Sequence, residues 1–235
     1  MSHTHVFKDN QAVAEAFAEY LYQQVEAAGK YFHLALSGGT TPKVLFDHLA
    51  EAYADRMDWD KVHLYWGDER CVAHNDPQSN FFMTSERLID KVPISPGNIH
   101  RIVGELLPER EARRYPLVLQ EMLPMENGRL IFDLIMLGMG SDGHTASIFP
   151  HQMELLTAEE TCAVAVHPDT GQRRITLTGE VINAARQIHF LVTGASKRPV
   201  VTEIFTHTGR CESYPAYHIR GAQWWMDEAA APSKE

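Results

Sequence analysis

The sequence is poor in cysteine. Its three cysteines, Cys71, Cys162 and Cys211, are widely spaced and odd in number. This pattern excludes a disulfide-rich scaffold and a C-x-x-C metal knuckle. We therefore expect reduced thiols that pack as small apolar side chains, which is the usual state of cysteine in the cytoplasm.

Long apolar runs are also absent. No segment approaches the roughly 20 apolar residues that a membrane-spanning helix needs. The first nine residues are polar and lack the apolar stretch of a secretory signal. We predict a cytoplasmic protein that does not bind membranes. Its first residues, including His3 and His5, are expected to form a solvated tail and not a metal site.

Positive charge is scarce, because 21 Lys and Arg stand against 31 Asp and Glu, a formal net charge of -10. This excess of acidic residues argues against nucleic acid or anionic membranes as partners and favours a small molecule or a protein. Linkers rich in Gly and Ser, charge blocks and internal repeats are absent as well. We predict that residues 1–235 form one domain, which is long enough to bury a sizeable core.

The sequence does contain a repeated change of hydrophobic period. Apolar residues recur at every second position, as in strands, or every three to four positions, as in helices. The alternation predicts an α/β fold with a mainly parallel sheet covered by helices on both faces. The Trp224-Trp225 pair is expected to cover an edge of this sheet. Predicted helices begin near Asn10, Pro42, Asp76, Pro108 and Pro199, and predicted strands lie at 31–36, 62–66, 132–137, 175–177 and 188–192.

Ligands of such a sheet bind beyond the carboxyl ends of its strands, and three loops occupy that position. The first loop contains Gly38, Gly39, Thr40 and Thr41. The glycines let the backbone approach an anion, the threonines offer hydroxyls, and the following helix directs free N–H groups to the same place. This arrangement predicts a phosphate cradle that differs from nucleotide-binding loops. A glycine-rich turn without a ligand is the alternative.

The second loop is Gly67-Asp68-Glu69-Arg70, followed by a polar stretch at 75–80. Arg70 can supply a fixed positive charge and a two-pronged donor to an anion or a developing oxyanion. Asp68 can orient a sugar hydroxyl or a base. A solvated turn is the alternative, since charged residues after a strand are common.

The third loop, residues 137–150, places three glycines around Asp142 and His144. The irregular backbone that these glycines allow can bring both side chains into one small space. Asp142-Gly143 also favours a hairpin turn, but residues 144–149 do not alternate as a returning strand would. Without a Ser or Cys nucleophile nearby, His144 is expected to act as a base on water. A purely structural histidine is the alternative.

Two further cations follow or precede predicted strands. Arg174 precedes the strand near 175–177, and Lys197 lies just after the strand at 188–192. Each alone is typical of a surface charge, but together they can close the cradle around a phosphate dianion. The net charge repels an anionic substrate, so its capture depends on Arg70, Arg174 and Lys197 lying together near the helix end after Thr41.

Taken together and in order, these loops resemble the 6-phosphogluconolactonase family, which shares a fold superfamily with the glucosamine-6-phosphate isomerase/deaminases. Each motif is weak alone, but the ordered set is specific and spans residues 37–197. The matching motifs are S-G-G-T-T-P at 37–42, W-G-D-E-R at 66–70, D-P-x-S-N at 76–80, G-M-G-S-D-G-H-T-A-S-I-F-P at 138–150, R-I-T-L-T at 174–178 and G-x-S-K at 194–197.

The resemblance implies a modified Rossmann-like fold and hydrolysis of 6-phospho-D-glucono-1,5-lactone to 6-phosphogluconate, a step of the oxidative pentose phosphate pathway. It implies no metal and no organic cofactor, and its only implied partner is the phosphorylated lactone. The state of assembly stays open between monomer and homodimer. By the resemblance His144 is the general base with Asp142 beside it, and Arg70 is an active-site arginine. The phosphate-handling positions are Gly39, Thr40, Thr41, Arg174 and Lys197.

Two other functions compete with this interpretation. A glucosamine-6-phosphate deaminase/isomerase carries an acidic residue five positions after the loop histidine, where this sequence has Phe149 followed by Pro150. A non-catalytic sugar-phosphate sensor needs an attached DNA-binding module, and one helix and one strand fill the 36 residues before the first loop. Both comparisons favour the lactonase.

Overall fold

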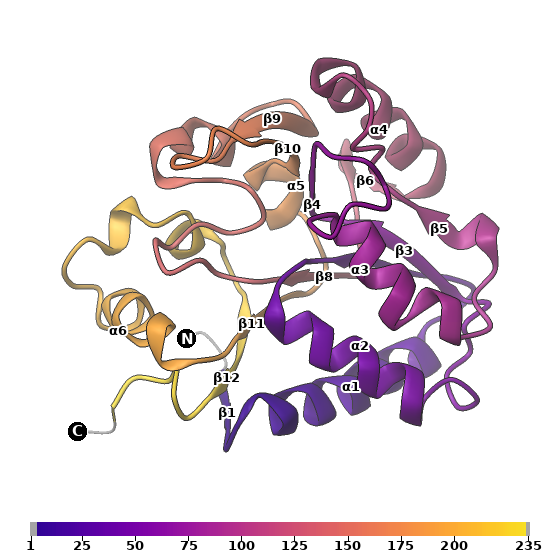
Figure 1. The fold of residues 1–235 in the computed structure, drawn as a ribbon, viewed down its shortest axis with the longest axis horizontal. Helices are drawn as coiled ribbons and strands as arrows, with labels where there is room; N and C mark the ends of the chain where they lie inside the picture. Colours follow the sequence, from indigo (N-terminus) through magenta and orange to yellow (C-terminus); the bar gives the residue numbers. More distant parts are fainter. Residues whose placement is uncertain (1–3, 234–235) are drawn as a thin grey trace.

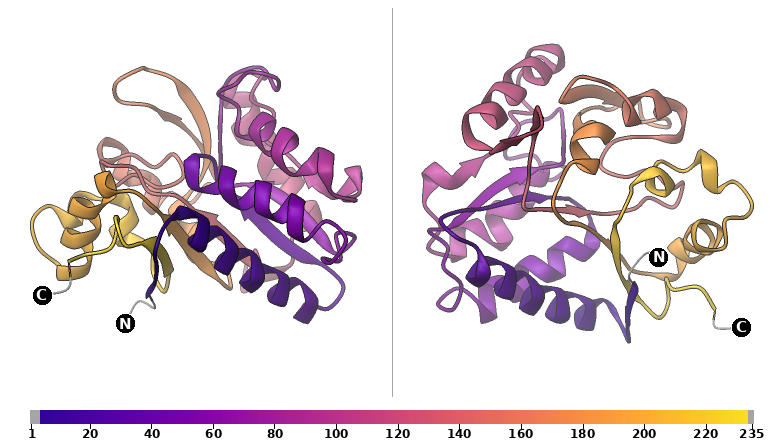
Figure 2. Two further views of the ribbon diagram at one scale, coloured as in Figure 1. Left: turned by 60° about the horizontal axis from the view of Figure 1, so that its bottom comes forward. Right: turned by 180° about the vertical axis from the view of Figure 1, so that it is seen from behind.

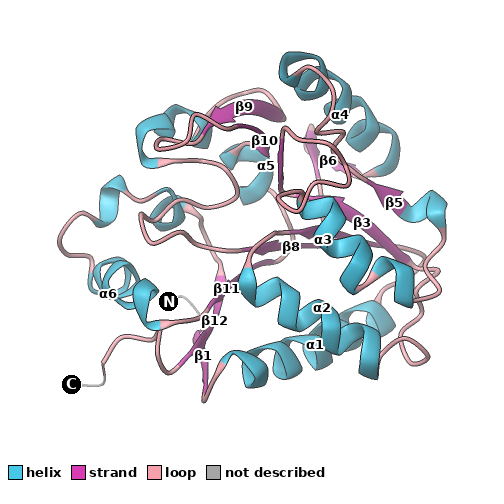
Figure 3. Ribbon diagram, in the orientation of Figure 1, coloured by secondary structure: helices cyan, strands magenta, loops and turns pink. Residues whose placement is uncertain are grey.

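The computed structural model describes residues 4–233, which are built around a seven-stranded sheet (Figures 1 and 3). Its strand order is β1-β12-β11-β8-β2-β3-β5, and every neighbouring pair is parallel. All carboxyl ends therefore meet at one edge. The strands are β1 (Thr4–Phe7), β2 (Phe32–Leu36), β3 (Val62–Trp66), β5 (Ile99–His100), β8 (Leu134–Leu137), β11 (Ile188–Val192) and β12 (Gln223–Asp227).

Helices cover both faces of this sheet, as predicted. Neighbouring residues of a strand point to opposite faces, and Trp225 packs on Phe17 of α1 whereas Trp224 packs on Phe205 of α6. Figures 1 and 2 show α1 and α2 side by side on their face. The α-helices are α1 (Asn10–Ala27), α2 (Thr40–Ala52), α3 (Asn80–Arg87), α4 (Pro108–Met122), α5 (Gly179–Asn183) and α6 (Arg198–Thr206).

Helix α1 shows why the sequence folds this way locally. The Asp9 carboxylate accepts a hydrogen bond from the Ala12 N–H at 2.9 Å and so caps the first turn. The apolar stripe predicted from the sequence, which includes Phe17 and Leu21, is buried against the sheet and α2. Burying each such side chain stabilises the fold by about 1.5–3 kcal/mol.

A second, three-stranded antiparallel sheet stands next to the carboxyl edge of the first. It consists of β4 (Asp68–Arg70), β10 (Arg173–Leu177) and β9 (Cys162–Val166), in that order. Gly67 joins the sheets, because its N–H donates to the Leu36 carbonyl while its own carbonyl accepts from the Leu177 N–H. The predicted strand near 175–177 thus exists but belongs to this smaller sheet. Asp68–Arg70, predicted as a loop, is a strand because it pairs with β10.

Four further local predictions are wrong. Residues 4–7 are not a solvated tail but form β1, which pairs with β12, and His5 stacks on Trp225; His3 lies outside the described residues. The tryptophan pair does not cover an edge, because β12 lies between β1 and β11. Helix α3 begins at Asn80 with Ser79 as its cap, and not at Asp76. Helix α2 begins at Thr40, two residues before Pro42.

Membrane-spanning helices and disulfides are two features that the sequence predicts to be absent. None of the helices in residues 4–233 is long and apolar enough to cross a membrane. The three cysteines are free thiols, and Cys162 and Cys211 are buried as expected whereas Cys71 is half-buried. Burial raises the pKa of the Cys71 thiol to about 11, so this thiol is protonated at neutral pH.

Candidate active site

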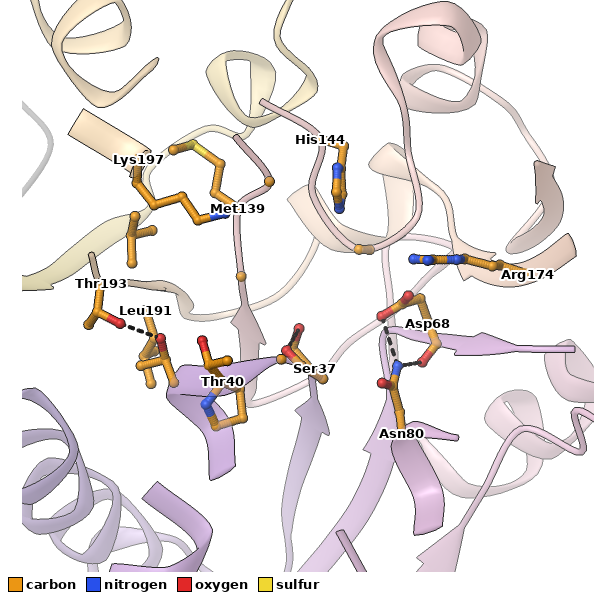
Figure 4. A pocket seen from close by; sticks show the side chains of 18 of the residues that line it. Ser37, Thr40, Asp68, Asn80, Met139, His144, Arg174, Leu191, Thr193 and Lys197 are labelled. Carbon is orange, nitrogen blue, oxygen red and sulfur yellow. Dashed lines mark hydrogen bonds between the residues drawn. The ribbon is translucent and has the colours of Figure 1, made fainter. Parts of the chain in front are cut away.

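A pocket of about 210 Å³ opens at the carboxyl edge of the parallel sheet (Figure 4). The segments that follow β2, β3, β8 and β11 all contribute to its wall, as expected for an α/β sheet of this kind. The lining residues are Ser37, Gly38, Gly39, Thr40, Thr41, Pro42, Asp68, Arg70, Asn80, Gly138, Met139, Gly140, His144, Ala146, Arg174, Leu191, Val192, Thr193 and Lys197.

The amino end of α2 forms one part of this wall. Gly39 occupies the capping position with φ of 109°, a conformation that favours glycine, and no side chain caps the helix. The free N–H groups of the first turn and the positive end of the helix dipole therefore remain available at the pocket. The hydroxyls of Thr41 and Thr193 share a hydrogen bond of 2.7 Å, which ties this helix end to the end of β11. This end of the pocket can hold an anion.

His144 enters the pocket from the loop after β8. Its Nδ1 lies 2.6 Å from Oδ1 of Asp142, which also accepts from the His144 backbone N–H. Burial acts to raise the pKa of Asp142, but the hydrogen bonds and positive charge of His144 outweigh it and lower the pKa to about 2. Asp142 is therefore ionised at neutral pH and can only accept, so in a neutral imidazole the proton lies on Nδ1 and Nε2 keeps its lone pair. A Cβ on Gly140 would lie 2.2 Å from Nδ1, so a glycine is needed there.

Two arginines occupy directly paired positions on neighbouring strands of the small sheet. Arg70 of β4 and Arg174 of β10 are register partners, and both line the pocket. Like charges placed directly opposite each other destabilise a sheet. The buried Nε atoms of both arginines have no hydrogen-bond partner among residues 4–233. Neither guanidinium forms an ion pair with a carboxylate of residues 4–233, and two such groups together favour an anion between or beside them.

Contacts within the protein hold the two arginines in place. Arg70 donates to the Gln78 carbonyl at 2.6 Å. The guanidinium of Arg174 lies 5.5 Å from the ring centre of Phe149, and its charge is opposed by burial but favoured by nearby Asp68. The same Phe149 ring lies 4.8 Å from the His144 imidazole, measured between ring centres. Phe149 therefore packs against both the imidazole and one of the cations.

Asp68 is committed to contacts inside the protein. Its carboxylate accepts from the Ser147 hydroxyl at 2.7 Å, and its backbone carbonyl accepts from the Asn80 amide at 2.9 Å. The Ser147 hydroxyl in turn accepts from Arg174 at 3.4 Å. Asp68 is only 4% exposed. Its contacts link the arginine pair to α3 and to the loop after β8.

Lys197 lies on the other side of His144 from Arg174, beside Met139 (Figure 4). Burial lowers the pKa of Lys197, while the charge of Asp142 opposes that shift. The three predicted cations thus share one pocket, but they do not form one cluster in space. Cations are available at both ends of the pocket, with the imidazole between them.

All of the predicted site residues line this pocket except Asp142, which lies behind His144 and contacts it directly. Prediction from the sequence missed several lining residues. Ala146 and Asn80 lay within recognised motifs, but nothing in the sequence alone distinguished them from their neighbours. Thr193 and Ser37 could have been found as polar residues that directly follow strands. Within residues 4–233, no group of three or more His, Cys, Asp or Glu side chains is arranged to hold a metal ion.

The fold and the site define the class as an α/β protein with an anion-binding pocket that holds a histidine paired with a carboxylate. The sequence model of the family described as glucosamine-6-phosphate isomerases/6-phosphogluconolactonase matches residues 8–226, and the chain belongs to this family. Among its relatives, the 6-phosphogluconolactonase of Treponema pallidum is 42% identical over 85% of this chain and 83% of its own. The 6-phosphogluconolactonase of Haemophilus influenzae is 43% identical over 84% of this chain and 85% of its own.

Solved structures agree with these sequence relatives. The structure of 6-phosphogluconolactonase from Trypanosoma brucei is 27% identical and superimposes with a TM-score of 0.89, covering 98% of this chain and 97% of that one. The α/β fold predicted from the sequence, a mainly parallel sheet of the modified Rossmann-like type, is thereby confirmed.

Proposed function

We propose that this protein hydrolyses 6-phospho-D-glucono-1,5-lactone to 6-phosphogluconate with water activated by His144. One observation carries the proposal: the Asp142 carboxylate lies 2.6 Å from Nδ1 of His144, in a pocket with cations at both ends. A proton on Nδ1 leaves Nε2 as the basic atom. The relatives named 6-phosphogluconolactonase support the choice of substrate.

In the proposed reaction Nε2 of His144 takes a proton from water while the water oxygen attacks C1 of the lactone. The carbonyl oxygen becomes an oxyanion, which Arg70 stabilises. The ring oxygen then leaves and takes the proton back from the imidazolium, which gives the open-chain acid. General-base assistance of this kind contributes about 10²–10⁴-fold, and stabilisation of the oxyanion is usually the larger contribution.

We assign the phosphate to the amino end of α2, with Gly38, Gly39, Thr40 and Thr41, and to the side chain of Lys197. Arg174 binds the substrate from the other end of the pocket, beside Arg70. The support for this assignment is the uncapped helix and the presence of these groups in one pocket. Binding energy from the phosphate positions C1 against the water. Asp68 supports the arginine pair, and the reaction needs neither a metal nor an organic cofactor.

The remaining parts of the proposal concern the whole chain. We propose that it acts as one domain in the cytoplasm, as a monomer or homodimer, with the phosphorylated lactone as its partner and no role in binding nucleic acid. The free thiols favour a reducing compartment.

The test supplies freshly generated 6-phosphogluconolactone and measures acid release, and in parallel supplies glucosamine 6-phosphate and measures ammonia. We expect acid release well above the spontaneous rate and no ammonia. His144→Ala should return hydrolysis to the spontaneous rate and still bind 6-phosphogluconate in calorimetry. His151→Ala is the matched control, because His151 stacks on Phe149 without lining the pocket. Ammonia without acid release would overturn the proposal, and an active His144→Ala would refute the general base.

A further inference from the structure

The carboxylate of Glu69 is buried beside the pocket and takes no part in the proposed chemistry. It is 2% exposed, and each of its two oxygens accepts two hydrogen bonds. Oε1 accepts from the backbone N–H groups of Arg70 at 2.8 Å and Asn80 at 2.7 Å. Oε2 accepts from the Phe81 N–H at 2.8 Å and the Ser79 hydroxyl at 3.1 Å. These four donors are neutral, so the carboxylate is held by hydrogen bonds and the amino end of α3.

The position of Glu69 in β4 explains this arrangement. Side chains alternate across a strand, so Asp68 and Arg70 face the pocket while Glu69 points the other way, toward α3. The carboxylate therefore fixes β4 to α3 through the backbone of Asn80. The four donors carry no charge, so no ion pair explains the acidic residue. An ionised carboxylate fits here because its two oxygens can accept from all four donors at once.

Asn80 carries the connection onward to the first loop. Its side-chain amide donates to the Asp68 carbonyl at 2.9 Å. A Cβ built on Gly38 would lie 1.9 Å from Asn80 Oδ1, so the Asn80 amide packs directly against the Gly38 backbone. The path from Glu69 through Asn80 thus reaches both Asp68 in the small sheet and Gly38 at the large one.

We infer that Glu69 is a positioning residue, whose four accepted hydrogen bonds hold Arg70, Asp68 and Asn80 in register with the loop at Gly38. The inference rests on the proposed function, because it assigns a kinetic consequence to this network. Glu69→Gln keeps the size of the side chain but leaves one oxygen where there were two. Its amide N–H₂ group would then face two of the four donors, so two of the four hydrogen bonds would be lost.

The test compares Glu69→Gln with Glu111→Gln. Glu111 is equally buried, accepts from the Val103 N–H at 2.7 Å and pairs with Arg114 at 2.6 Å, but it does not line or adjoin the pocket. We expect both variants to lose thermal stability. Only Glu69→Gln should lower kcat, by about 10-fold, with KM raised less than about 3-fold, because its network reaches Gly38 but not Thr40, Thr41 or Lys197.

A readout independent of activity separates this inference from the proposed function. The side-chain amide signal of Asn80 in NMR, assigned by its loss in Asn80→Asp, should shift in Glu69→Gln and stay in place in Glu111→Gln. A wild-type protein that hydrolyses no lactone defeats the proposed function, while the amide signal still decides the positioning. An unmoved Asn80 signal, a kcat within about 2-fold of wild type, or an equal kinetic loss in Glu111→Gln overturns the inference. If Glu69→Gln does not fold, Ser79→Ala removes one donor and should give a smaller loss of kcat.

Discussion

Replacing Asp142 by asparagine tests the orientation of the proposed base. The carboxylate accepts from Nδ1 of His144 at 2.6 Å and leaves Nε2 free to take a proton. An asparagine side chain would offer an amide N–H or a weaker carbonyl acceptor to the same nitrogen. When the amide donates to Nδ1, the imidazole proton moves to Nε2, where it blocks the proposed reaction.

The contact itself sets the magnitude of the effect. A hydrogen bond to a charged partner is worth about 1.5–3 kcal/mol, and the imidazolium that forms in the transition state strengthens it. The Asp142 side chain is 42% exposed, so water weakens the interaction. About 1.5–2.5 kcal/mol corresponds to a loss of about 10- to 70-fold in kcat. KM should stay nearly unchanged, because Asp142 does not line the pocket.

The assay is steady-state release of acid from fresh lactone, corrected for spontaneous hydrolysis, with Asp90→Asn at an exposed position as the control. A kcat of Asp142→Asn within about 2-fold of wild type would refute the orienting role. A large rise in KM with normal kcat would instead show that Asp142 contacts the substrate.

Single contacts lead to three further predictions. Gly38→Ala places a methyl group 1.9 Å from Asn80 Oδ1, so thermal unfolding should show a loss of about 1–3 kcal/mol and kcat/KM should fall. Burial, with a smaller contribution from the charge of His5, lowers the pKa of His189 to about 4. The unfolded state therefore binds a proton first as the pH falls below 6.5, the ordinary pKa of histidine. Between that pH and pH 4 the free energy of unfolding falls by about 2–4 kcal/mol. His189→Gln should remove that loss in urea unfolding. Arg174→Ala should raise KM at least 10-fold and lower kcat less, as measured by initial rates.

Each control replaces a residue of the same type at another position. Gly29→Ala has open space around the new methyl group and should behave as wild type; equal loss from both glycine variants would contradict the packing argument. His74→Gln, at an exposed histidine, should leave the pH dependence of stability intact, and an unchanged slope in His189→Gln would count against burial as its cause. Arg173→Ala removes an arginine outside the pocket. A normal KM in Arg174→Ala would argue against its role in substrate binding.

The local elements could be predicted because their causes are local. Helix α1 follows from its apolar period and the Asp9 cap, and the buried parallel strands follow from short apolar runs. Elements whose cause is distant were missed. The strand at residues 4–7 exists because β12 pairs with it, and Asp68–Arg70 is a strand because β10 lies opposite. Neither partner is visible in the adjoining sequence.

The site shows the same division. Composition, loop chemistry and motif order predicted which residues gather at the carboxyl edge, because parallel strands deliver their following loops to one place. Distances between those residues were not predictable, since they depend on how the small sheet stands against the large one. The cations therefore lie at both ends of the pocket and not in one cluster.

The sequence by itself determined the α/β class, the family and most of the functional residues of the pocket. Hydrophobic period, turn-forming residues and the order of motifs are local properties of the chain, so they can be recognised without the fold. Only the tertiary structure decided that Asp142 contacts His144 rather than lining the pocket, and that Arg70 stands opposite Arg174. It also decided that Glu69 is buried against α3. These facts depend on strand register and on contacts between residues far apart in the chain, which packing sets and local patterns do not record.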